Sequence, residues 1–112
     1  MARDNCFRCR IRMGRLGAAM VELRDLRAFE ALAAELHFGR AAVRLGVSQP
    51  TLSRHVRRLE HELGVVLAHR TSRTVRLTDA GHELATALPA ALRQLEHTLA
   101  ATRAAADGGW KI

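Results

Sequence analysis

The chain has 112 residues, which is room for one small domain, and its low aromatic content of 4% is typical of a helical protein. Hydrophobic residues make up 48%, yet the uncharged stretch Leu84–Leu92 is far shorter than the roughly eighteen apolar residues of a membrane span. We therefore expect a globular, cytoplasmic protein without a membrane partner, and its net charge of +7 favours a polyanionic partner.

Residues 1–20 are predicted to be a disordered, basic N-terminal extension, because they are rich in arginine and lack the apolar core of a secretory signal. Our hypothesis is that Met20 is the natural start of the protein. Cys6 and Cys9 form a CxxC pair, but structural zinc needs four ligands and the six histidines are scattered along the chain. We expect two reduced thiols, no metal site and no cofactor.

Residues Phe38–Gly64 predict two helices joined by a tight turn. The first helix would place four apolar side chains on one side: Phe38, Ala41, Ala42 and Leu45. Gly46 suits the left-handed backbone that ends a helix, and Val47 is placed to pack under the turn. Ser48 is then an N-cap candidate for the second helix, where Pro50 stands early enough for its missing N–H to cost little.

The second of these helices has one apolar stripe, formed by Leu52, Val56, Leu59 and Leu63. At about 100° per residue, the opposite face carries Pro50, Ser53, Arg54, Arg57, Arg58 and His61. The alternative is an ordinary solvated face. However, the two acids Glu60 and Glu62 are confined to the last turns, and eight arginines lie between Arg40 and Arg76. This pattern favours a helix that reads DNA.

Two short segments after Gly64 predict a β-hairpin, or wing. They are Val65–His69 and Thr74–Leu77, which are rich in valine and leucine. The tip of the hairpin would then consist of Arg70, Thr71, Ser72 and Arg73. Arg73 would lie beside the minor groove or the DNA backbone, where the negative potential attracts a cation.

A long helix is expected from the N-cap candidate Thr78 to about Ala106, ended by Gly108 and Gly109. Pro89 should kink this helix or remove one backbone hydrogen bond. The helix carries an apolar stripe of Leu84, Leu88, Leu92, Leu95 and Leu99. The spacing is close to that of a coiled-coil seam and predicts a dimer, whereas the alternative is packing of these leucines on their own domain.

Four stretches resemble the N-terminal DNA-binding domain of LysR-type transcriptional regulators: Glu22–Phe29, Leu36–Gly64, Leu67–Arg70 and Val75–Gly81. The resemblance implies a mainly α fold, a winged helix-turn-helix of three helices and a two-stranded wing, followed by a long linker helix. It divides the chain into the DNA-binding domain at 21–78, the linker or dimerisation helix at 79–107, and the truncated start of an effector-binding domain at 108–112.

The resemblance also implies the roles of individual residues. Base edges would be read by Gln49, Pro50, Ser53 and Arg54, since glutamine suits adenine and arginine suits guanine. The DNA backbone or the wing would involve Arg40, Thr51, His55, Arg57, Arg58, Arg70 and Arg73. Dimerisation would use Leu88, Leu92, Leu95 and Leu99.

These observations predict a regulator that binds double-stranded promoter DNA as a homodimer, and a tetramer is a further expectation for the full-length protein. No effector is expected to bind this fragment, and no nucleophile, base and acid stand at a spacing that indicates an enzyme. The alternative is a truncated interaction module that pairs through its linker helix with a full-length regulator. An enzyme or redox protein built on the CxxC pair is a third, weaker hypothesis.

Overall fold

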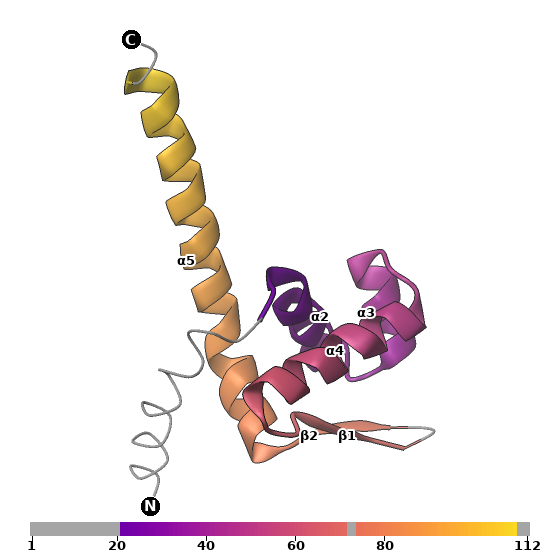
Figure 1. The fold of residues 1–112 in the computed structure, drawn as a ribbon. Helices are drawn as coiled ribbons and strands as arrows, with labels where there is room; N and C mark the ends of the chain where they lie inside the picture. The colour runs from indigo at the N-terminus through magenta and orange to yellow at the C-terminus, as the bar shows by residue number, and fades with distance from the viewer. Residues whose placement is uncertain (1–20, 72–73, 110–112) are drawn as a thin grey trace, which may run out of the picture.

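The computed structural model describes residues 21–71 and 74–109, in which four helices and a two-stranded antiparallel sheet follow one another (Figure 1). The elements are α2 (Leu23–Glu35), α3 (Phe38–Leu45), α4 (Gln49–Leu63), β1 (Ala68–Arg70), β2 (Val75–Leu77) and α5 (Asp79–Gly109). The mainly helical fold with a short wing and a long final helix is as predicted. The N-terminal extension, its CxxC pair, the proposed start at Met20, the tip residues 72–73 and the C-terminal residues 110–112 lie outside the described residues.

The turn between α3 and α4 has the predicted local chemistry. Gly46 is left-handed, with φ 80°, and its N–H donates to the carbonyls of Ala42 and Val43. The N–H of Val47 also donates to the Ala42 carbonyl, at 3.0 Å, and the Val47 side chain packs against the core. Ser48 caps α4, because its Oγ accepts from the N–H of Thr51 at 3.2 Å. The turn is therefore closed from both sides by its own residues.

The wing is shorter than predicted on its first strand. Ala68 pairs with Leu77 and Arg70 with Val75, so β1 begins three residues later than expected and includes Arg70, which was assigned to the tip. Val65 is exposed and its N–H donates to the Glu60 carbonyl, in a hydrogen bond that belongs to the end of α4. Val65 therefore belongs to the C-terminal cap of α4, and the chain enters the sheet only at Ala68.

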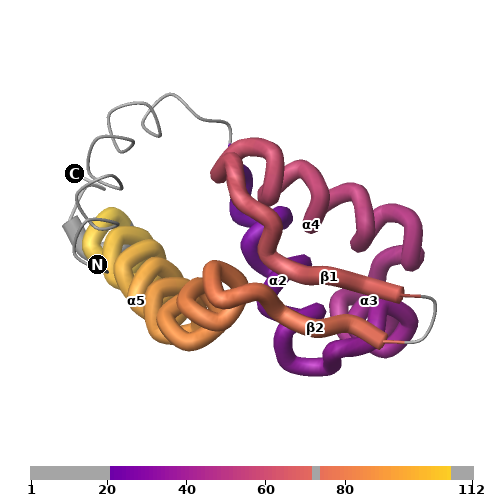
Figure 2. The backbone as a smooth tube through the Cα atoms, turned by 90° about the horizontal axis from the view of Figure 1, so that it is seen from below, coloured from indigo at the N-terminus to yellow at the C-terminus, as the bar shows by residue number. Residues whose placement is uncertain are grey.

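Two clusters of buried residues form the core. The first joins α2, α3, α4 and β2 through Ala28, Ala31, Leu32, Ala41, Ala42, Leu52, Val56 and Val75. The second joins α2, α4 and the chain before β1 to α5 through Phe29, Leu59, Leu67, Leu88 and Leu92. The wing and the beginning of α5 are thereby fixed against the three-helix body, and the rest of α5 extends away from it (Figures 1 and 2).

The four leucines of the predicted dimer seam have different surroundings. Leu88 and Leu92 are only 5% and 4% exposed because they pack on α2 and α4 of the same chain, whereas Leu95 and Leu99 are 40% and 52% exposed. The helix also runs three residues past Ala106 and continues through Pro89. No helix in residues 21–71 and 74–109 has the length and hydropathy required to cross a bilayer.

Candidate nucleic-acid interface

The first two turns of α4 present the four residues that were predicted to read bases. Gln49, Pro50 and Arg54 are exposed, and Ser53 is half-buried where the wing approaches the helix. Their direction follows from the opposite side of the helix, where Leu52, Val56 and Leu59 are buried in the core. These four side chains are thus brought together on one accessible surface.

Thr51 belongs to a hydroxyl network at the beginning of α4. The Ser48 hydroxyl donates to Thr51 Oγ1 at 2.8 Å, and Arg54 Nη2 donates to the same oxygen at 3.4 Å. Thr51 is therefore held between the cap of the helix and the Arg54 side chain. This contact directs the guanidinium of Arg54 along the exposed side of the first turns.

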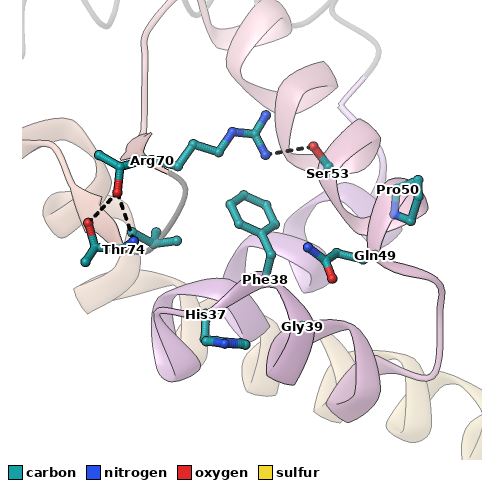
Figure 3. Close-up of a pocket in the computed structure, with 10 residues that line it drawn as sticks. His37, Phe38, Gly39, Gln49, Pro50, Ser53, Arg70 and Thr74 are labelled. Atoms are coloured by element: carbon teal, nitrogen blue, oxygen red, sulfur yellow. Dashed lines mark hydrogen bonds between the residues drawn. The ribbon is translucent and has the colours of Figure 1, made fainter.

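A notch of about 540 Å³ lies between the wing, the beginning of α3 and the beginning of α4 (Figure 3). Its lining consists of His37, Phe38, Gly39, Gln49, Pro50, Ser53, Arg70, Thr71, Thr74 and Val75. Three predicted base readers share this notch with the wing residue Arg70: Gln49, Pro50 and Ser53. The fold therefore joins the two segments that were expected to contact DNA.

Arg70 connects the wing to the helix-turn-helix. Its guanidinium lies over the Phe38 ring, with its central carbon 4.5 Å from the ring centroid, which is a cation–π arrangement. Its Nη1 donates to Ser53 Oγ at 2.9 Å, and Figure 3 shows the side chain reaching from β1 across to α4. Arg57 also donates to Ser53 Oγ, from its Nη2 at 3.4 Å.

His55 and Arg58 face α2 and pair with acidic side chains there. His55 Nδ1 lies 2.9 Å from Oδ1 of the fully buried Asp25, and Arg58 Nε lies 3.5 Å from the other oxygen of that carboxylate. Arg58 Nη2 also pairs with Glu22 at 2.7 Å. Both residues were predicted to hold phosphates, and the structure gives their polar groups partners within the protein.

Arg40 and Arg44 lie at the two ends of α3, near the end of α2. Arg40 Nε is 3.5 Å and Arg44 Nη1 is 3.1 Å from the carboxylate of Glu35. The surface to which Arg40 contributes is thus partly neutralised. Arg73 lies outside the described residues, so its predicted place beside the minor groove is left as an expectation.

The remaining basic surface is well defined. Within the described part of the chain, Arg54, Arg57 and Arg70 have no carboxylate within ion-pair distance. Three cations without neutralising acids produce a positive potential across the exposed side of α4 and the notch. Such a surface attracts a polyanion, while the neutral polar groups of Gln49 and Ser53 offer directional hydrogen bonds.

Sequence reasoning missed three residues that position this surface. Asp25 anchors α4 to α2, and Glu60 accepts from the N–H groups of Leu67 and Ala68, which fixes the start of the wing. His37 caps α3 through Nδ1, which accepts from the Arg40 N–H at 3.0 Å. Only His37 had a signal, because it immediately precedes a predicted helix.

Comparison with protein families matches residues 23–82 to the family described as bacterial regulatory helix-turn-helix protein, lysR family. The chain is 49% identical over 82 residues to the HTH-type transcriptional activator IlvY of Salmonella typhimurium, covering 70% of this chain and 28% of that protein. It is 40% identical over 95 residues to the RuBisCO operon transcriptional regulator of Allochromatium vinosum, covering 82% of this chain and 32% of that protein. The chain thus spans about a third or less of these relatives.

Two solved protein–DNA complexes contain similar folds. The BenM_DBD/catB site 1 DNA complex superimposes with a TM-score of 0.71 at 39% identity, covering 78% of this chain and 98% of that chain. The CbnR_DBD–DNA complex has a TM-score of 0.71 at 40% identity, covering 76% and 98%. The curated relatives above are transcriptional regulators, in agreement with the expectation that this chain is not an enzyme.

Proposed function

The chain belongs to the LysR family of bacterial regulatory helix-turn-helix proteins, and from that premise we propose that it binds promoter DNA as a dimer. In this proposal α4 enters the major groove and the wing lies beside it, in the cytoplasm where chromosomal DNA is found. The single observation that carries the proposal is the exposed side of α4, where Gln49, Ser53, Arg54 and Arg57 stand together without an acid.

We assign the contacts by the chemistry of each side chain. Gln49 suits the N6 and N7 edge of adenine, Arg54 suits the O6 and N7 edge of guanine, and Ser53 and Pro50 lie against neighbouring base edges. Phosphates are bound by Arg57, Arg70, Arg40, Thr51 and the tip residue Arg73. His55 and Arg58 act indirectly, since their contacts with Asp25 and Glu22 fix the angle of α4.

The proposed dimer uses the exposed part of α5. Leu95 and Leu99 lie one turn apart, so a second copy of the helix can cover both. A two-fold axis through this contact gives two copies of α4, which fit two half-sites about one DNA turn, or a multiple of it, apart. The operator is then an interrupted near-palindrome.

A second function uses the same leucines. If α5 pairs with the corresponding helix of a full-length regulator, the chain acts as an interaction module rather than as a reader of DNA. The observation in its favour is the exposure of Leu95 and Leu99. The two functions differ in whether the purified chain alone binds duplex DNA.

The test is a titration of duplex DNA at several salt concentrations. If about six phosphates are neutralised, log K should fall with log salt at a slope near −5. Arg57→Ala should reduce the magnitude of this slope by about one, as expected for a lost phosphate contact. The matched variant Arg58→Ala should change it less, because Arg58 is paired with Glu22. A slope near zero, or no binding at low salt, contradicts the proposal.

A further inference from the structure

The hydroxyl of Ser53 has an unusual environment for a residue on an exposed helix side. Its oxygen accepts from Arg70 Nη1 at 2.9 Å and from Arg57 Nη2 at 3.4 Å. A serine hydroxyl has two acceptor lone pairs and one proton to donate. Two guanidinium groups therefore occupy both lone pairs of the oxygen. The O–H is the one group of this side chain that is still free to form a hydrogen bond.

The free proton of Ser53 contrasts with the threonine hydroxyls of α5. Thr86, Thr98 and Thr102 each donate to the carbonyl four residues earlier, at 2.8–2.9 Å. In the described part of the chain, Ser53 makes no such bond and is an acceptor in both of its hydrogen bonds. Its donor is thus available on the surface that we assign to the DNA.

We propose that Arg70 is a positioning residue that fixes Ser53 as an obligatory donor, so that Ser53 selects a base that offers an acceptor. This inference rests on the proposed DNA-binding function. The acceptors in the major groove are N7 and O6 of guanine, N7 of adenine and O4 of thymine, whereas the major-groove group of cytosine is the N4 donor. A serine with a free lone pair can accept from the N4 donor of cytosine, but one whose two lone pairs are occupied by Arg70 and Arg57 cannot.

The position of Arg70 depends on the flat face and the N–H donors of its guanidinium, which a lysine side chain lacks. The planar guanidinium stacks on Phe38 while its Nη1 donates to Ser53. A lysine ammonium at this position keeps the charge and can still bind a phosphate, but it lacks the flat face and the fork of N–H donors. The Arg70→Lys variant therefore separates the positioning role from a simple charge.

The experiment begins with a randomised duplex library selected by the wild-type 112-residue chain, which gives its preferred duplex. Dissociation constants are then measured for that duplex and its single-base variants. Ser53→Ala identifies the position at which Ser53 discriminates. At this position, Arg70→Lys should weaken discrimination against cytosine by about fivefold, the equivalent of one ordinary hydrogen bond. Combining both substitutions should cause no further loss there.

Two further variants complete the test. Phe38→Leu, which removes the ring under Arg70 and keeps an apolar side chain against the core, should weaken discrimination at the same position. Arg76→Ala, which removes an exposed charge from the neighbouring strand, should weaken all duplexes alike. The inference is overturned if Arg70→Lys retains full discrimination or if Ser53→Ala changes no base preference. If the wild-type chain selects no sequence and binds no duplex, the proposed function itself fails.

Discussion

The two halves of α5 carry the same apolar repeat but have different surroundings. In the inner half, residues 79–92, Leu88 and Leu92 are buried against Phe29 and Leu59. In the outer half, residues 93–109, the helix extends away from the three-helix body (Figure 1), and Leu99 is 52% exposed. One continuous helix thus serves as part of the core at one end and as an unpartnered surface at the other.

This difference shows what a leucine repeat specifies. The repeat fixes which side chains lie along one side of the helix, but the length of the neighbouring body decides where burial stops. At 1.5 Å per residue, the 31-residue helix is longer than a small helical body. The leucines beyond Leu92 therefore remain available for a second chain, and this boundary can be tested by substitution.

The largest expected effect is the loss of a core leucine. Leu92→Ala should lower the free energy of unfolding by about 2–5 kcal/mol, because it removes a buried side chain and leaves a cavity beside Phe29. Leu99→Ala should change the stability of the monomer little. Urea denaturation at low protein concentration measures both. Equal losses from the two variants would contradict the division of α5.

The second prediction concerns the point where the inner half docks on the wing. A Cβ added at Gly81 would lie 2.1 Å from the Leu67 carbonyl oxygen. Gly81→Ala should therefore displace α5 and lower the free energy of unfolding by about 1–3 kcal/mol or more. Gly46→Ala is the control, since it meets no atom within 4 Å and costs only the strain of its φ of 80°. A smaller loss for Gly81→Ala than for Gly46→Ala in thermal melts would disprove the close contact.

The third prediction tests the outer half as the dimer surface. The double variant Leu95→Asp/Leu99→Asp should stay folded, sediment as a monomer and lose about tenfold or more in affinity for a two-half-site operator, which equals 1.4 kcal/mol or more. Its affinity for a single half-site should not change. Leu92 is unsuitable for this purpose because it is buried in the monomer. A dimer that survives the double substitution must use another surface.

The features that the sequence predicts correctly are local ones. Gly46, Ser48 and the stripe of α4 depend on residues within one or two turns of the chain, so spacing alone identifies them. The Asp25–His55 contact joins residues thirty positions apart, and no periodicity in the sequence predicts it. The start of β1 was misplaced for a similar reason, since the carboxylate of Glu60 holds the preceding backbone.

The candidate site shows the same limit. Helix phase placed Ser53 and Arg54 on the exposed side of α4, whereas the family resemblance assigned His55 and Arg58 to contacts with the DNA backbone. Their acidic partners come from α2, which packs against that edge of α4. The contact of Arg70 with Ser53 depends on the path of the wing, which helix phase does not predict. Phase defines the faces of a helix, whereas tertiary packing decides which charges remain unpaired.

The smallest expected effect belongs to the ion pair at the junction of the two halves. Arg27 Nη2 of α2 lies 2.7 Å from Glu96 Oε2, one residue after the first exposed leucine. Both side chains are more than a third exposed, so water and salt screen the pair. A double-mutant cycle of Arg27→Ala and Glu96→Ala should give a coupling of about 0.2–1 kcal/mol at low salt, falling as salt is added.

Arg103→Ala is the matched control in the outer half, and it should leave stability unchanged because its side chain is exposed. A coupling between Arg27 and Glu96 that exceeds about 1 kcal/mol and resists salt would mean that this junction is desolvated. Packing with the body would then extend beyond Leu92 into the outer half. A weak, salt-sensitive coupling means that the contact with α2 in the turn containing Leu95 is electrostatic and screened by solvent. The boundary between core and free surface then lies at this turn.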